Sequence, residues 1–109
     1  MILFREEEGV IKGEQISTDH KPDLAEERVR IEKADGLLDQ HESQLTGKKI
    51  GPLRVWSKVV RQPGLAMTRS FGDKLAKTVG VISRPTVRVF QRDKKKDRAL
   101  LVCSDGVSD

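Results

Sequence analysis

The carboxyl-terminal end of the sequence carries two aspartates, Asp105 and Asp109, separated by a Gly-Val-Ser stretch. The apolar run before them, Leu100 to Cys103, is typical of a buried strand, so the aspartates are expected in the loop at its end. Hard divalent cations prefer carboxylate oxygens as ligands. If the chain turns helical from Gly106, residues four positions apart share a face, and both carboxylates could approach one ion cluster. The residues alone indicate a candidate divalent-metal site, with a plain Asp-Gly turn and a frayed terminal residue as the alternative.

Other polar residues could take part in chemistry, but each also has a structural interpretation. Arg69 and Asp73 could form a phosphate-binding turn, although a structural ion pair between them is the favoured interpretation. His20 could act as a ligand or an acid, but a histidine in a polar turn more often hydrogen-bonds nearby backbone. His41 has no recognisable partner and receives no role. The sequence contains no phosphate-cradling glycine loop with lysine, no Cys/His zinc spacing and no nucleophile elbow.

The composition describes a polar chain with a modest capacity for a hydrophobic core. Of its 109 residues, 36% are hydrophobic and 35% are charged. The net charge of +4 and the pI near 9.4 could indicate a nucleic-acid partner. We expect no nucleic-acid partner, because the densest basic run, Lys94 to Lys96, lies between two aspartates and has no aromatic residues beside it for base stacking. No stretch predicts a membrane span, and the single cysteine excludes an internal disulfide, which favours a cytoplasmic or nuclear protein.

The first third of the sequence predicts a hairpin followed by a helix. Residues 1–4 and 10–17 have the pattern of an antiparallel hairpin around a charged turn. A helix is predicted from Pro22, because proline suits the first turn and acidic residues follow it where the helix dipole favours them. Asp35-Gly36 is predicted to end this helix.

The remainder of the sequence predicts shorter elements. Residues 37–61 are predicted to be an irregular excursion, with a short strand at 53–56. A short helical turn is expected to end at Lys77. Two strands, 86–90 and 98–103, are predicted to follow, joined by the lysine-rich turn. The whole is therefore expected to be α+β with mainly antiparallel sheet.

Five separated motifs follow one another in an order and spacing that resemble a known enzyme family. They are Ser17–Pro22, Gly51–Trp56, Pro63–Asp73, Val79–Val81 and Ser104–Gly106. Together they resemble the metal-dependent serine/threonine protein phosphatases of type 2C, over nearly the whole chain from about Ile16. The resemblance implies that residues 1–109 are a partial type 2C phosphatase catalytic domain, with a flap-like segment at about 37–60.

The resemblance also implies a fold, a reaction and site residues. The fold would be part of a two-sheet antiparallel β-sandwich flanked by helices, incomplete in this chain. The family holds Mg²⁺ or Mn²⁺ through carboxylates, and a metal-activated water attacks a phosphoserine or phosphothreonine of a protein substrate. Asp105 and Asp109 match metal ligands of the family, and no residue is assigned as catalytic. The architectural positions of the motifs are matched by His20, Arg69, Gly72, Asp73 and Gly106.

Several features on which the family's activity depends have no counterpart in this sequence. The acidic N-terminal ligands, the Asp-Gly-His-Gly-Gly motif and the phosphate-binding arginine would precede Met1, and the final aspartate would follow Asp109. Ser108 also stands where the family commonly has a bulky aromatic residue. We therefore expect a segment of a larger domain, with weak or absent metal binding and no efficient catalysis alone. The alternative is a pseudophosphatase or a partner-binding module, and exposed strand edges predict self-association.

Overall fold

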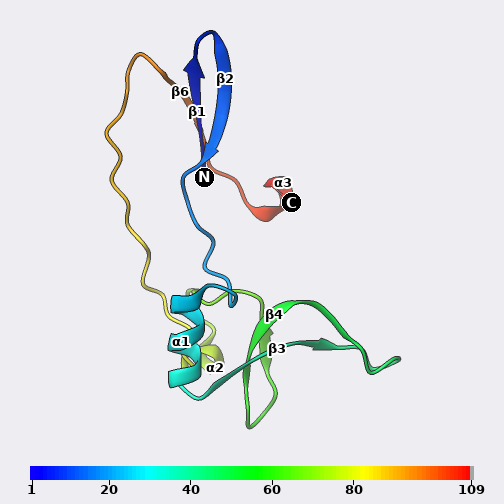
Figure 1. Cartoon of the computed structure of the whole chain (residues 1–109). Coiled ribbons are helices and arrows are strands. Elements are labelled where there is room, and N and C mark those ends of the chain that lie inside the picture. The colour runs from blue at the N-terminus through cyan, green and yellow to red at the C-terminus, as the bar shows by residue number, and fades with distance from the viewer. Residues whose placement is uncertain (109) are drawn as a thin grey trace. The chain divides into compact units, whose positions relative to one another are not determined.

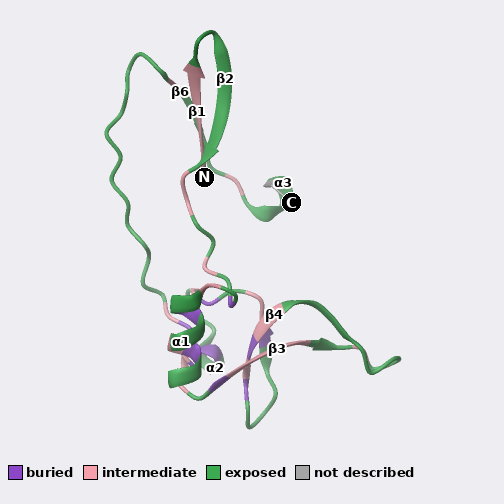
Figure 2. Ribbon diagram, in the orientation of Figure 1, coloured by how far each residue is buried: buried purple, intermediate pink, exposed green. Residues whose placement is uncertain are grey.

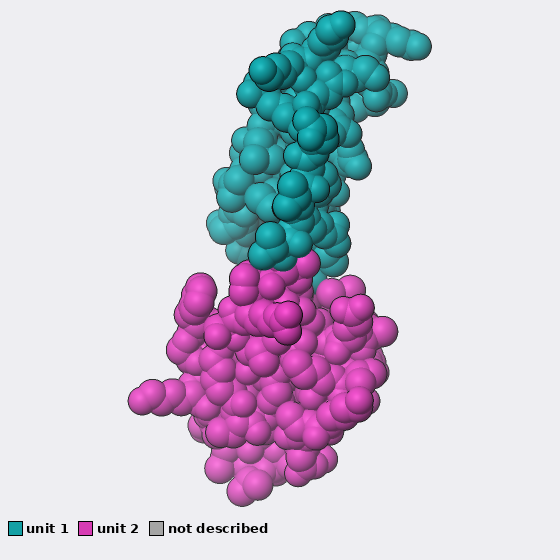
Figure 3. All heavy atoms as spheres, turned by 90° about the vertical axis from the view of Figure 1, so that its left-hand side faces the viewer, with its two compact units in different colours: residues 1–19, 87–109 teal, residues 20–86 magenta. Residues whose placement is uncertain are grey.

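The computed structural model describes residues 1–108, with side chains through Val107. The chain forms two compact units, which are coloured separately in Figure 3. Unit 1 consists of residues 1–19 and 87–109, and unit 2 consists of residues 20–86. Each unit contains its own three-stranded antiparallel sheet. No helix in the described part of the chain is long and apolar enough to span a membrane.

Unit 1 is built on a sheet with the strand order β2-β1-β6 (Figure 1). Its strands are β1 (Ile2–Glu7), β2 (Val10–Gln15) and β6 (Asp97–Leu101), and the short helix α3 (Asp105–Ser108) follows β6. The β1–β2 hairpin confirms the predicted one, with Phe4 opposite Gly13. On its other side β1 pairs with β6, so that Leu3 lies opposite Leu100.

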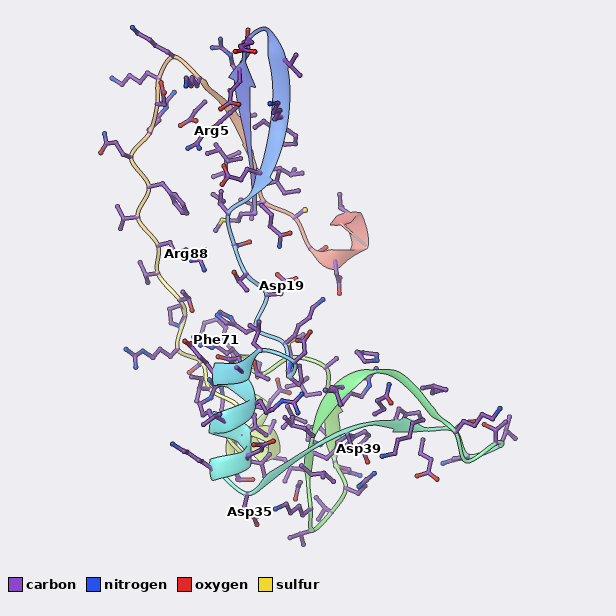
Figure 4. The ribbon with its side chains drawn as sticks, in the orientation of Figure 1. Arg5, Asp19, Asp35, Asp39, Phe71 and Arg88 are labelled. Atoms are coloured by element: carbon purple, nitrogen blue, oxygen red, sulfur yellow. The ribbon has the colours of Figure 1, made fainter. Side chains whose placement is uncertain are left out.

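An ion pair joins β1 to β6 in unit 1. The Nε of Arg5, labelled in Figure 4, donates to Oδ1 of Asp97 at 2.7 Å. This hydrogen bond lowers the pKa of Asp97, and a backbone hydrogen bond from Asp93 acts in the same direction. Since β6 leads toward Asp105, the pair helps to fix the register of the strand that precedes the metal-ligand candidate.

Unit 2 combines two helices with a sheet of order β3-β4-β5. Its helices are α1 (Ala25–Lys33) and α2 (Lys74–Lys77), and its strands are β3 (Gly36–Glu42), β4 (Lys49–Ser57) and β5 (Pro63–Leu65). The buried residues of the chain gather in this unit, around α1, α2 and β4 (Figure 2). The hydrophobic core consists of Ile31, Val55, Ala76, Val79 and Val81, with Leu38 and Leu65 packed against it.

Helix α1 ends where the sequence predicts, and the reason is a close contact. Gly36 follows Asp35, whose φ of 60° turns the backbone out of the helix. A Cβ atom on Gly36 would lie 2.6 Å from Cγ2 of Ile31 and 2.7 Å from the carbonyl oxygen of Val79. Only a glycine therefore allows β3 to leave the helix this close to the core.

The prediction of an irregular excursion at 37–61 is wrong, because β3 and β4 form a hairpin that covers most of it. Its polar residues had argued against a strand, but the pairing gives them partners. Asp39, on β3 in Figure 4, binds Nζ of Lys49 at 2.6 Å and Nη2 of Arg61 at 3.0 Å. The indole N–H of Trp56 donates to the Asp39 carbonyl oxygen at 3.0 Å. Cross-strand contacts thus override a weak local pattern.

The predicted strand at 86–90 is also wrong. Residues 83–93 are extended but belong to no strand (Figure 1), so the predicted hairpin through the lysine-rich turn does not form. The turn instead leads into β6, whose partner is β1. The alternating apolar residues of the segment remain exposed, with Val87 at 79% and Val89 at 93%. A strand needs a partner, and propensity alone does not supply one.

Candidate functional site

Asp105 follows β6, as the sequence predicts, but the strand is mostly exposed and not buried as expected, because no layer in the described part of unit 1 covers it. Asp105 itself is exposed and stands in the first turn of α3, followed by the exposed Gly106. The backbone N–H of Val107 donates to the Ser104 carbonyl oxygen at 3.1 Å and closes the turn. This turn presents the Asp105 carboxylate at the surface of unit 1, where an oxygen ligand for a cation would have to be.

The described residues do not form a complete metal cage around Asp105. Among them, no three His, Cys, Asp or Glu side chains come together in a way that could hold an ion. One carboxylate supplies two oxygens, whereas Mg²⁺ is coordinated by about six ligands. Asp105 fits as one ligand of a divalent ion, but not as its whole site. The second predicted ligand, Asp109, lies outside the described residues, so the pairing of the two aspartates remains a prediction.

A dense polar cluster lies in unit 2, around a buried carboxylate that the sequence did not single out. We call it the Glu27 cluster, and its members are Glu27, Arg30, Thr68 and Arg69. The Glu27 side chain is buried, with the residue 1% exposed. It comes from α1, as does Arg30, while Thr68 and Arg69 come from the loop that follows β5.

Two guanidinium groups hold the Glu27 carboxylate. Arg30 donates from Nη1 to Oε1 at 2.9 Å and from Nη2 to Oε2 at 2.5 Å. Arg69 donates from Nη2 to Oε1 at 2.6 Å and from Nε at 3.2 Å. Burial alone would raise the pKa of Glu27, but the hydrogen bonds from Arg30, Arg69 and Thr68 outweigh it and hold that pKa well below its ordinary range. The carboxylate is therefore a fixed anion between two cations.

The same cluster connects several loops of unit 2. The Thr68 hydroxyl donates to Oε2 of Glu27 at 2.5 Å, and its oxygen also lies 2.9 Å from the His20 carbonyl oxygen. Nε of Arg30 donates to the Gly80 carbonyl oxygen at 2.9 Å. Nη1 of Arg69 donates to the Arg84 carbonyl oxygen, also at 2.9 Å. The predicted motifs are thus tied together through one acidic side chain.

The structure corrects two predictions about the motif residues. Arg69 pairs with Glu27 rather than with Asp73, because the carboxylate of α1 faces its guanidinium. Asp73 is exposed and precedes α2 with a φ of 46°, without capping that helix through its side chain, and Gly72 beside it is also exposed. The His20 ring does not bond nearby backbone, since its Nε2 lies 2.9 Å from Oγ1 of Thr86.

The stability of unit 2 is expected to fall at acid pH because of Glu27. Because folding lowers the pKa of Glu27 from an ordinary value of 4.5, its contribution to stability is complete above that pH and is lost progressively as the pH falls below it. Urea unfolding from pH 7 to pH 3, followed by Trp56 fluorescence, measures this loss. Asp39, which is also in unit 2, has a lowered pKa as well and acts in the same direction. The Glu27→Gln variant shows how much of the acid-induced loss of stability comes from Glu27. If the variant loses as much stability between pH 7 and pH 3 as the unchanged chain does, the assignment to Glu27 is contradicted.

Comparison with known proteins assigns the chain to a family. The sequence model described as Protein phosphatase 2C matches residues 1–109. The chain belongs to the protein phosphatase 2C family. It is 42% identical to "Probable protein phosphatase 2C 61" of Arabidopsis thaliana, over 100% of this chain and 32% of that protein. It is 39% identical to "Probable protein phosphatase 2C 48" of Oryza sativa subsp. japonica, over 87% of this chain and 25% of that protein.

A solved phosphatase 2C structure has the same fold. The crystal structure of serine-threonine phosphatase 2C from Toxoplasma gondii matches with a TM-score of 0.66 and 25% identity, over 87% of this chain and 31% of that one. The expectation of an α+β fold with two antiparallel sheets is thereby confirmed. The chain spans about a third or less of the length of these protein phosphatase 2C relatives.

Proposed function

We propose that this chain contributes to a metal-dependent protein serine/threonine phosphatase. The observation that carries the proposal is the match of the protein phosphatase 2C family to every residue from 1 to 109. Members of this family are generally metal-dependent and act on phosphoproteins. The identity of the ions as Mg²⁺ or Mn²⁺, and of the substrate as phosphoserine or phosphothreonine, is part of the proposal.

In this proposal the two units contribute in different ways. Unit 1 contributes Asp105 as a metal ligand, supported by its exposure at the end of β6, and Asp109 as a further ligand. Unit 2 contributes a rigid scaffold around the Glu27 cluster and the β3–β4 hairpin as a flap beside the substrate. A bound ion would supply an activated water for attack on the phosphorus. Ligands beyond the described residues must complete the ion's coordination.

A hybrid enzyme tests this function. This chain would replace the matching region of "Probable protein phosphatase 2C 61", once the intact relative is shown to hydrolyse a phosphothreonine peptide with Mn²⁺. We expect the hybrid to be active and Asp105→Asn to lower its rate by about 100-fold or more, because one charged ligand is lost. Asp23→Asn, at an exposed position outside the proposed site, is the matched control. An inert hybrid that is folded would contradict the assignment.

A second candidate is a pseudophosphatase or partner-binding module. It is motivated by Ser108, which stands between the two aspartates where the family commonly has a bulky aromatic residue and which the hybrid would keep. This candidate predicts that the hybrid folds and still binds the phosphothreonine peptide, but hydrolyses none of it at any Mn²⁺ concentration. The same assay therefore separates the two functions.

We also propose that the isolated chain self-associates through unit 1. The edge strands of its sheet are β2 and β6, and both expose apolar side chains, with Val10 at 56%, Ile11 at 61% and Leu100 at 55%. Unpaired apolar edges favour pairing with a second copy. Sedimentation velocity is expected to show concentration-dependent oligomers, which Ile11→Lys reduces. The control is Leu45→Lys, at a residue that is 97% exposed in unit 2. A monomer at all concentrations would contradict the proposal.

A further inference from the structure

One contact in unit 2 has no part in the phosphatase chemistry proposed above. His20 and Thr86 are the first and last residues of the unit, and their side chains meet. Nε2 of His20 lies 2.9 Å from Oγ1 of Thr86, and Nη1 of Arg69 lies 3.3 Å from the same oxygen. One threonine hydroxyl is thus faced by an imidazole and a guanidinium, and both can donate hydrogen bonds to a phosphoryl group.

We propose that Thr86 is a phosphorylation site whose phosphoryl group is bound by His20 and Arg69. In the modification, Oγ1 of Thr86 attacks the γ-phosphorus of ATP. The new Oγ1–P bond forms as the bond to the ADP oxygen breaks, and the hydroxyl proton passes to a base of the kinase. The phosphoryl oxygens would then accept the hydrogen bonds that Oγ1 takes part in now.

The charges around Thr86 favour an added anion. Arg69 uses Nε and Nη2 for Glu27, which leaves Nη1 directed at Thr86 and at the Arg84 carbonyl oxygen. The Arg69 guanidinium therefore stands between the buried carboxylate and the hydroxyl. With Arg30 also bound to Glu27, the Glu27 cluster carries one net positive charge. Glu26 is the other carboxylate that acts on Arg69, and it is exposed, so solvent screens it.

The position of Thr86 is suited to a kinase. Thr86 is exposed and lies in the extended stretch that belongs to no strand, and extended chain can be bound by another protein without first unfolding. Pro85 also disfavours a helical conformation at Arg84. Arg84 lies two residues before Thr86 and Arg88 two residues after it, so a kinase that selects basic sequences is the expected class.

The proposal is tested on the full chain with phosphothreonine incorporated at position 86. We expect the melting temperature to rise by about 4 °C, because the phosphate gains charge-assisted hydrogen bonds within a small unit. Its ³¹P signal should titrate with a pKa of about 5.5 or lower, against about 6 for an exposed phosphate. His20→Ala should remove a large part of both effects while leaving the Glu27 cluster intact.

The controls separate a bound phosphate from a general effect of charge. Phosphothreonine at Thr46, an exposed residue of the β3–β4 hairpin, should leave the melting temperature unchanged or lower. A panel of basophilic kinases with ATP should phosphorylate the chain but not its Thr86→Val variant. The proposal fails if phosphorylation at Thr86 lowers the melting temperature, if its phosphate titrates like that at Thr46, or if no kinase of the panel modifies Thr86.

Discussion

Glu27→Gln is expected to lower the free energy of unfolding of unit 2 by about 3 kcal/mol. The substitution keeps the shape of the side chain but removes the charge that compensates two arginines. Because Arg30 and Arg69 are only 25% and 17% exposed, water cannot fully replace the carboxylate, and removing one partner of a buried ion pair costs about 3 to 5 kcal/mol. Because the two arginines are partly exposed, we expect a cost at the lower end of this range.

Urea unfolding at pH 7 measures the loss. Trp56 is the single tryptophan of the sequence and lies on β4, so its fluorescence follows unit 2 alone. Glu32→Gln is the matched control, since Glu32 is an exposed residue of the same helix and is expected to change stability by about 0.5 kcal/mol or less. Equal stability of the two variants would show that the Glu27 cluster is not the main polar support of this unit.

Gly36→Ala is expected to destabilise unit 2 by about 2 to 3 kcal/mol. The added methyl group would lie 2.6 Å from Cγ2 of Ile31 and 2.7 Å from the Val79 carbonyl oxygen. Both atoms belong to the packed core, where overpacking costs about 1 to 3 kcal/mol. The backbone oxygen cannot move aside without shifting the segment after α2, so the upper part of this range applies.

The same fluorescence-detected unfolding measures this effect. Glu32→Ala is the control, because Glu32 is an exposed residue of α1 in the same unit, where an alanine removes no packed atoms. We expect the control to unfold at the urea concentration of the unchanged chain and Gly36→Ala to unfold well below it. A Gly36→Ala chain of full stability would mean that α1 and β3 are not packed as closely as the structure shows.

The elements with strong local signals could be predicted from the sequence. In the β1–β2 hairpin each strand begins with apolar residues and a charged turn joins the two strands. Helix α1 has proline near its start, acidic residues in its first turn and Asp35-Gly36 at its end. These signals act over a few residues, so no tertiary information is needed to interpret them.

The elements that depend on distant partners could not be predicted. β3 contains several polar residues. It forms a strand because the backbone of β4 pairs with it and because Lys49 and Trp56 of β4 donate hydrogen bonds to it. The stretch at 86–90 has the stronger β pattern but gains no partner strand. In both cases the deciding contacts come from other parts of the chain, which local propensity does not encode.

The candidate site was predicted unevenly for the same reason. Asp105 follows an apolar strand, which is a local signal, and the structure places it at the end of β6. Glu27 appeared to be an ordinary acidic residue of a helix N-terminus. Its spacing of three residues from Arg30 was the one local signal of a pair. Its second partner, Arg69, is distant in the sequence, and only the fold brings the two together.

The most direct test of the central claim, that Asp105 is a metal ligand of a phosphatase, is Mn²⁺ titration calorimetry on the hybrid enzyme. Titration measures binding itself and does not depend on the rate of hydrolysis. The account predicts that Asp105→Asn weakens Mn²⁺ binding by about 10-fold or more while Asp23→Asn leaves it unchanged. Mn²⁺ affinity that is the same with and without the Asp105 carboxylate would contradict it.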